Sequence, residues 1–175
     1  MYNSYGNYFE VQDEKNTKNK NMAVRYMPYI FEDARSHQSA MNRGDYNKAV
    51  AEAEQMGEKS LKAIAQNKGK LSNNLKRKNG HDLIKLANAC DGIELGVSKQ
   101  DLQMLTDAYF SSRYPEGKKK YTKEEAENSG KVACKLLDTA IDELNIPLTV
   151  LDKELGTAEN QDRVEMLGSF SRLMK

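Results

Sequence analysis

The chain has 175 residues and a mass of 19.8 kDa, which is enough for one compact domain with additional tails. Charged residues make up 30% and apolar residues 38% of a hydrophilic chain (mean hydropathy -0.81) that still has core-forming side chains. The net charge of +1 excludes a globally basic nucleic-acid binder, so attraction for phosphate has to come from local clusters of cations.

The N-terminal third of the chain predicts a tail followed by two helices. Residues 1–21 begin with aromatic side chains and continue as a polar Asn- and Lys-rich run without helical period, which is typical of a tail. A first helix is predicted over residues 27–43, with Pro28 in its first turn. A second follows over residues 46–68, because Asp45 is a suitable cap and apolar side chains then recur at intervals of three and four.

Three further helices are predicted after a basic loop, the first of them short and spanning residues 81–89. Each of the two longer ones begins at a capping box, formed by Ser98 with Asp101 and by Thr122 with Glu125. They end before Pro115 and at Pro147, because proline disfavours helical geometry in the residue that precedes it. Apolar residues beyond Pro147 indicate one or two short amphipathic helices.

The apolar faces of five linked helices can be buried only by packing the helices together, and no segment alternates like a strand. We therefore predict an all-α, up-and-down helical bundle of about five helices over residues 22–146. The N-terminal tail covers residues 1–21, and residues 147–175 form a short C-terminal amphipathic helical extension.

The cysteines give no sign of a disulfide or a metal site. Cys90 and Cys134 both lie among small apolar residues, where a thiol packs as a small hydrophobic group, so we expect reduced core cysteines. No CxxC or Cys/His pattern exists, and we predict no bound metal. The absence of an apolar leader and of a run near 18 apolar residues predicts a cytoplasmic protein without a membrane span.

Cations gather in two separate segments that we expect to bind phosphate. Residues 67–81 read NKGKLSNNLKRKNGH and contain no acid, and a lysine run follows Arg113. In an up-and-down bundle these two loops emerge at the same end, where they would create a local positive potential. The predicted nucleotide- or phosphate-binding residues are Arg77, Lys78, His81, Arg113, Tyr114, Lys118, Lys119 and Lys120.

Several of these residues suit distinct parts of a nucleotide. Arg77 and Arg113 present planar forks for phosphate, and His81 can donate or accept a proton near neutral pH. Tyr114 can stack on a base. The backbone N–H groups at the start of the third predicted helix, behind Gly80, would add an anion site that needs no side chain.

The same residues also fit structural roles. Lysine-rich loops are often solvated turns, and a histidine beside Asp82 at a helix start is often a hydrogen-bonded cap. Arg113 can equally pair with an acid such as Glu58 or Glu125.

Four fragments occur in the order and spacing of a known family. They are EQMGEKSLKAI (residues 54–64), GHDLIKL (80–86), SSRYPEG (111–117) and TKEEAENSGKVACKLLDTAIDEL (122–144). Over roughly residues 22–146 the chain resembles the HEPN domain (higher eukaryotes and prokaryotes nucleotide-binding), particularly the branch similar to the domain at the end of sacsin. The resemblance implies a bundle of about five helices, frequent homodimerisation and a functional cleft near the dimer axis.

HEPN proteins include metal-independent RNases, often toxins or antiphage effectors, and non-catalytic members that bind nucleotides or partner a small nucleotidyltransferase. The RNase branch carries an arginine, four to six residues and then a histidine on the later part of the bundle. Here no histidine follows Arg113, and Arg77 precedes His81 with only three residues between, before the third predicted helix. The remaining histidine, His37, lies mid-helix and is predicted to be structural.

The leading prediction is therefore a non-catalytic HEPN homodimer that binds a nucleotide such as ATP or GTP, or RNA, and requires no cofactor. One alternative is a divergent metal-independent RNase, acting as a toxin or antiphage effector, whose catalytic residues would be His81 with Arg77 and Arg113. The other is an interaction module that partners a small nucleotidyltransferase.

Overall fold

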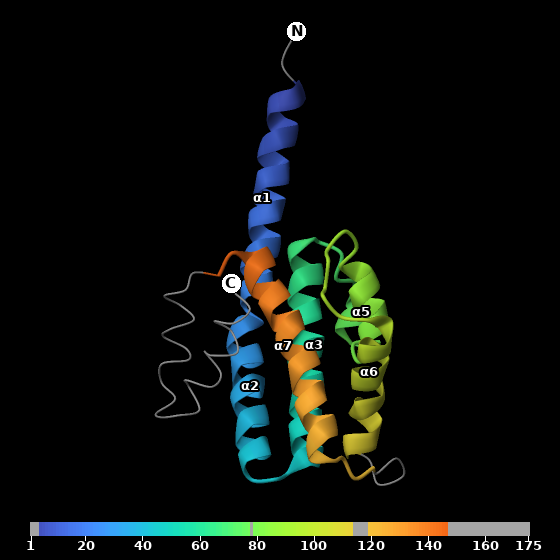
Figure 1. Ribbon diagram of the computed structural model, residues 1–175. Helices are drawn as coiled ribbons and strands as arrows, with labels where there is room; N and C mark the ends of the chain where they lie inside the picture. Colours follow the sequence, from blue (N-terminus) through green and yellow to red (C-terminus); the bar gives the residue numbers. More distant parts are fainter. Residues whose placement is uncertain (1–3, 78, 114–118, 147–175) are drawn as a thin grey trace.

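The computed structural model describes residues 4–77, 79–113 and 119–146, and these ranges contain seven helices and no strand (Figure 1). The helices are α1 (Ser4–Val24), α2 (Met27–Asn42), α3 (Tyr46–Asn67), α4 (Asn73–Lys76), α5 (Leu83–Ala89), α6 (Lys99–Arg113) and α7 (Lys123–Leu144). The predicted all-α bundle is confirmed. Its predicted C-terminal extension lies outside the described residues.

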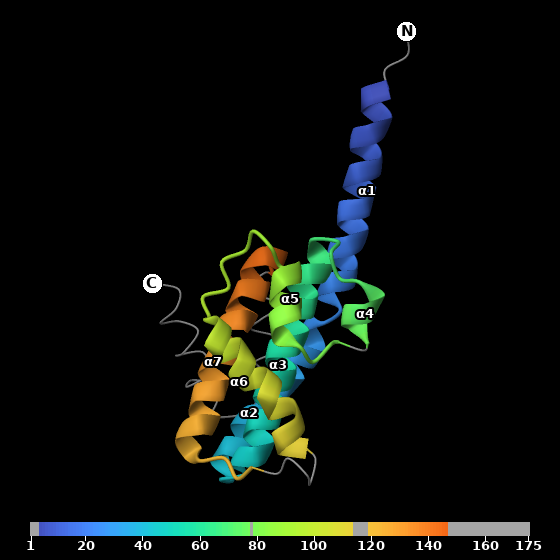
Figure 2. The ribbon, with the colours of Figure 1, turned by 90° about the vertical axis from the view of Figure 1, so that its right-hand side faces the viewer.

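Helix α3 is the centre of the bundle and packs against α2, α5, α6 and α7 (Figures 1 and 2). Because it has neighbours on most sides, it buries residues around most of its circumference, as a core helix does. Its fully buried apolar side chains include Met56, Leu61 and Ile64. At Gly57 the missing side chain lets Leu105 of α6 and Leu136 of α7 approach the helix closely.

Local signals in the sequence set the helix starts. The Asp45 side chain accepts a hydrogen bond from the backbone N–H of Lys48 at the start of α3. A capping box of Thr122 and Glu125 opens α7, as predicted. The predicted reciprocal contacts of Ser98 and Asp101 are also present before α6.

Helix α1 replaces part of the predicted tail. Residues 4–24 are helical although their apolar side chains follow no helical stripe, and most of the helix projects beyond the bundle (Figure 1). Its C-terminal part is attached to the bundle, since Ala23 is fully buried and Asn19 accepts a hydrogen bond from Gln66 of α3. Periodicity missed α1 because a projecting helix has no face to bury.

The connection from α3 to α5 departs from simple up-and-down order. The chain returns along α3 as far as the middle of that helix, where His81 contacts Glu58. Cys90, at the end of α5, then donates to the carbonyl of Leu61, which is closer to the C-terminal end of α3. Helix α5 therefore runs parallel to α3, and α6 then runs antiparallel to both (Figure 2). The short α4, which the sequence analysis did not predict, lies within this returning connection.

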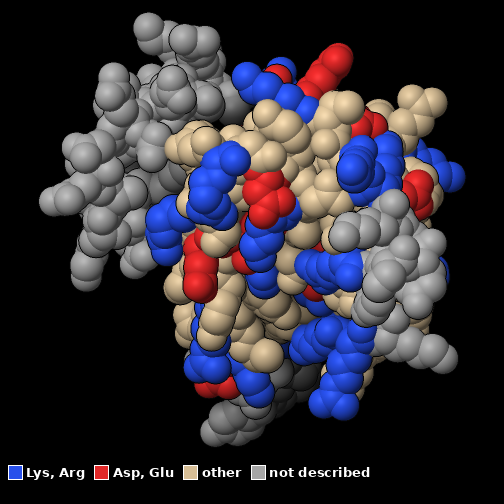
Figure 3. Space-filling model, turned by 90° about the horizontal axis from the view of Figure 1, so that it is seen from below, with Lys and Arg blue, Asp and Glu red and all other residues tan. Residues whose placement is uncertain are grey.

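This topology corrects the prediction that the two basic loops meet at one end. Asn67, at the end of α3, donates to the carbonyl of Glu143, and Asn47, at its start, donates to that of Lys119. Lys68 and Lys70 thus lie at one end of α3, and the lysines before α7 lie at the other, about 30 Å away. Figure 3 shows the end near the start of α7, where Lys and Arg are spread over the face with Asp and Glu between them.

The remaining core residues behave as the sequence analysis expects. Both cysteines are free, and burial raises the pKa of Cys90 to about 12 and that of Cys134 to about 11. His37 bonds through Nδ1 to the carbonyl oxygen of Ala49, 2.8 Å away, and burial lowers its pKa. Among the described residues, no helix has the length and apolar character to cross a membrane.

Candidate functional site

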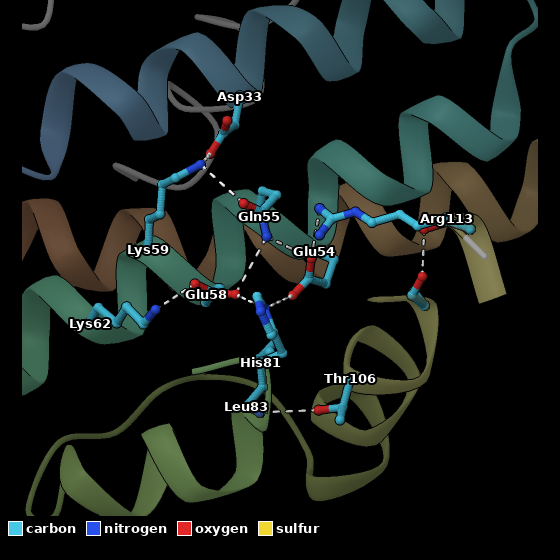
Figure 4. A network of polar contacts seen from close by, with 12 residues as sticks. Asp33, Glu54, Gln55, Glu58, Lys59, Lys62, His81, Leu83, Thr106 and Arg113 are labelled. Atoms are coloured by element: carbon cyan, nitrogen blue, oxygen red, sulfur yellow. Dashed lines mark hydrogen bonds and ion pairs between the residues drawn. The ribbon is translucent and has the colours of Figure 1, made fainter. Parts of the chain in front are cut away.

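Two glutamates lie in the middle of α3 on the side that faces α5 and α6. Glu54 is 0% exposed and Glu58 is 5% exposed, which is rare for carboxylates unless they are paired. Their spacing of four residues puts both side chains on the same face of the helix. The residues around them form one polar network (Figure 4).

Glu58 is held from two sides. Its Oε2 lies 2.5 Å from Nδ1 of His81, and its Oε1 accepts a hydrogen bond of 2.6 Å from Nζ of Lys62. Lys62 also donates to the carbonyl of Lys76 at 3.4 Å, so it joins the glutamate to the end of α4. His81 remains 35% exposed, so one edge of its ring can meet a ligand.

Within the described residues, Glu54 accepts hydrogen bonds through one oxygen only. Its Oε2 accepts from Nε2 of Gln55 at 2.8 Å and from Nη2 of Arg113 at 3.3 Å. Its buried Oε1 has no hydrogen-bond partner within the described part of the chain. Burial raises the pKa of Glu54 to about 8, and the nearby Glu58 adds to this effect while Gln55 and Arg113 oppose it.

An aromatic ring connects His81 and Arg113, the partners of the two glutamates. The rings of His81 and Tyr109 are stacked, with centroids 3.5 Å apart and an interplanar angle of 19°. The guanidinium of Arg113 lies 4.6 Å from the centre of the same tyrosine ring. Phe110 packs edge-on against Tyr109 and is 60% exposed. Tyr109 therefore holds His81 and Arg113 in fixed orientations beside an exposed aromatic ring.

The segment that carries His81 is itself fixed. Gly80 passes so close to Lys62 that an added Cβ would lie 2.7 Å from its Nζ. At the start of α5, Leu83 N–H donates to Oγ1 of Thr106 and Lys85 N–H donates to Asp82. Because these side chains accept hydrogen bonds from the N–H groups at the start of α5, those groups are not available to an anion. The predicted anion site at this helix end was therefore wrong.

A hollow of about 640 Å³ adjoins Arg113, between the start of α3 and the end of α6. Three cations lie in its lining, namely Lys48, Arg113 and Lys120. Asp45 and Glu52 also line it, so the hollow is positive only on part of its wall. Its volume is within the range of pockets that bind small ligands.

The predicted site residues divide into three groups. His81 and Arg113 come together on the two buried glutamates, and Lys120 shares the hollow with Arg113. Lys119 instead pairs with Glu125 at 2.5 Å, and Arg77 is exposed at the end of α4. The other three, Lys78, Tyr114 and Lys118, lie outside the described residues.

Comparison with known families gives one match. The family model of the HEPN domain matches residues 31–144, about two thirds of the chain. The chain belongs to the HEPN domain family. No curated protein and no solved structure shows significant similarity to it.

Membership in the HEPN family supports a nucleotide- or RNA-related function in general. The matched range contains both buried glutamates, His81 and Arg113, so the polar network is part of the HEPN domain itself. Assignment to the sacsin-like branch of HEPN proteins stays a prediction.

Sequence reasoning missed the centre of this HEPN site. Glu54 and Glu58 both lie in one of the family fragments, and Arg113, for which Glu58 was a predicted alternative partner, pairs with Glu54 instead. A signal was available, because both acids fall within the apolar stripe of α3, where a charged residue needs a buried partner. The contribution of Tyr109 had no comparable signal.

Proposed function

We propose that this HEPN protein binds a nucleotide or single-stranded RNA through phosphate, without using its own side chains for catalysis. One observation carries the proposal. Arg113 and His81, which are distant in sequence, lie against one tyrosine ring, and their exposed fractions are 31% and 35%. An arginine and a histidine that are held in place and partly exposed are the kind of groups that bind phosphate.

The geometry of Arg113 suits phosphate. Glu54 occupies one terminal nitrogen of its guanidinium in the described structure, and the tyrosine ring supports its face, so the planar fork is oriented before a ligand arrives. Burial raises the pKa of Glu54, and the side chain of Arg113 is 31% exposed, so part of its guanidinium faces solvent where an anion can reach it.

The surroundings extend this contact toward a whole nucleotide. Lys120 lines the hollow beside Arg113, where a further phosphate could be neutralised, whereas Lys48 is already paired with Glu52. On the other side, the exposed ring of Phe110 offers a surface on which a base can stack. This arrangement favours ligands that combine phosphate with a base over inorganic phosphate alone.

Ligand-dependent thermal shifts test the proposal. ATP, GTP or a short single-stranded RNA should raise the melting temperature of the wild-type protein, because a ligand of the folded state stabilises it. Arg113→Ala should weaken binding about 10-fold to 100-fold, the value of a charge-assisted hydrogen bond. Arg43→Ala is the matched control, since Arg43 is exposed and bonds only Ser39 among the described residues. Equal affinity of the two variants would refute this site.

A second candidate function, RNA cleavage without a metal, is favoured by the contact between His81 and Glu58. A carboxylate on Nδ1 fixes the imidazole so that Nε2 can accept a proton from a ribose hydroxyl, and Arg113 would steady the phosphate. Labelled RNA incubated with the pure protein in a chelator decides between the two. Cleavage that His81→Ala or Arg113→Ala abolishes would establish the RNase, and intact RNA would support the binder.

We further propose a cytoplasmic homodimer that requires no cofactor for binding. HEPN domains commonly form dimers, which supports the proposed homodimer. A protein that failed every ligand test but formed a complex with a small nucleotidyltransferase would support the interaction module instead.

A further inference from the structure

Three potential metal ligands converge inside the polar network. One oxygen of Glu54, one oxygen of Glu58 and one ring nitrogen of His81 all lie within 4.8 Å of one another. From His81 Nδ1, the distance is 2.5 Å to Oε2 of Glu58 and 3.8 Å to Oε1 of Glu54. A tetrahedral zinc ion with ligands at about 2.1 Å needs separations of roughly 3.4 Å, so small side-chain movements would suffice.

The buried oxygen of Glu54 indicates that the cluster is incomplete. Oε1 has no hydrogen-bond partner among the described residues, although the side chain is 0% exposed and the atom faces His81. An unpaired buried carboxylate oxygen is costly, because it has lost its hydrogen bonds to water without gaining others. A bound cation would provide the missing partner.

The other oxygens of both glutamates are already held from outside the cluster. Glu58 Oε1 accepts from Lys62, and Glu54 Oε2 accepts from Gln55 and Arg113. A cation that used Oε1 of Glu54, Oε2 of Glu58 and Nδ1 of His81 would therefore leave these outer contacts in place. Such outer hydrogen bonds are what orients the ligands in metal sites.

We propose that Glu54, Glu58 and His81 form a binding site for a divalent transition metal of the zinc class. One imidazole and two carboxylates are ligands that zinc accepts, whereas Mg²⁺ prefers oxygen ligands and water. Three protein ligands leave a fourth position for water or for an oxygen of a bound phosphate. The metal site would thus adjoin the proposed phosphate site, but its existence does not depend on nucleotide binding.

The charges that face the cluster set its affinity. Lys62 and Arg113 lie on its outer side and repel a cation, and the pair of Lys59 with Asp33 adds no net charge nearby. The two glutamates offset the two facing cations, so we expect moderate rather than tight binding. Replacing Arg113 with alanine should strengthen zinc binding while it weakens nucleotide binding.

Titration of the metal-free, untagged protein with ZnCl₂ tests the site, using a chromophoric chelator as competitor. The wild type should bind one zinc ion and melt at a higher temperature when it is bound. Glu54→Gln and His81→Gln should each weaken binding at least about 10-fold. Because either variant could misfold, circular dichroism of both is needed, and loss of binding in a folded variant supports the site.

A matched variant separates this site from thiol chemistry. Cys134→Ser should bind zinc as the wild type does, and the Co²⁺-loaded protein should lack a thiolate charge-transfer band. The proposal is wrong if the wild type binds no zinc saturably, if folded Glu54→Gln binds as tightly as the wild type, or if Cys134→Ser loses the metal. Nucleotide binding by Arg113→Ala, measured in parallel, reports separately on the proposed function.

Discussion

Asp138 is a carboxyl group of α7 that lies outside the polar network. Its Oδ2 is buried and has no hydrogen-bond partner among the described residues. Burial raises its pKa to about 7, and the nearby Asp142 contributes to the increase. The folded protein therefore holds a proton on this residue between about pH 4 and pH 7 that the unfolded chain releases.

This proton makes stability depend on pH. Since the folded state binds more protons in that range, the contribution of Asp138 to the free energy of unfolding should fall as pH rises from 4 to 7, by an amount that solvent screening of its exposed part reduces. Asp138→Asn should remove this contribution, so its advantage over the wild type grows with pH in urea unfolding experiments. The exposed Asp107→Asn serves as control and should keep the wild-type slope. A constant difference between Asp138→Asn and the wild type would contradict the prediction.

Gly130 and Gly57 are both buried helical glycines, yet they should respond differently to alanine. An added Cβ at Gly130 would collide with Nε2 of His37, a ring that is fixed by its bond to Ala49. At Gly57 it would lie 3.2 Å from a methyl group of Leu105 and 3.3 Å from one of Leu136, contacts that movements of a few tenths of an ångström relieve. We expect Gly130→Ala to cost about 1–3 kcal/mol in chemical unfolding and Gly57→Ala clearly less, because alanine also favours the helix. The reverse order would show that His37 moves easily.

At the level of the helices, the elements with a local signal were predictable from the sequence. The bounds of α2, α3, α6 and α7 lie within a few residues of prediction, because caps and apolar stripes are properties of neighbouring residues. Two helices were not predictable in this way: α1, which projects from the bundle, and α4, whose single turn is too short to show a period. Both are held by contacts with distant residues.

The capping box of α7 offers a quantitative test of one such local signal. Thr122→Ala removes the side-chain acceptor for the backbone N–H of Glu125 and should lower the free energy of unfolding by about 1 kcal/mol. Thr122→Ser retains a hydroxyl and should stay close to the wild type. Equal melting temperatures for all three proteins would mean that the start of α7 is held by other contacts, such as that of Tyr121 with Asn47.

For the whole molecule, the order of helices was predictable but their directions were not. The sequence contains no signal that the connection between α3 and α5 turns back along α3, because this depends on contacts such as those of His81 and Lys62. The expected convergence of two basic loops failed for that reason. The candidate site was only half predicted: its exposed cations were named, and the buried acids that position them were not.

The oligomeric state is a prediction at the same scale. If the proposed homodimer forms, light scattering after gel filtration should give about twice the 19.8 kDa mass of one chain. The measurement should be repeated across a tenfold range of protein concentration, since a weak dimer dissociates on dilution. A mass of one chain throughout this range would remove the dimer from the proposal.

The burial of Glu54 and Glu58 has a consequence for how the layers of the bundle align. A slide of the α5 and α6 layer along α3 by one turn, about 5.4 Å, would remove Leu105 from its place beside Gly57. Such a slide would also separate Glu54 and Glu58 from His81 and Arg113. Both acids would then be buried without these partners, at a cost of several kcal/mol. The contacts of the two acids therefore favour a single position of the α5 and α6 layer along the axis of α3.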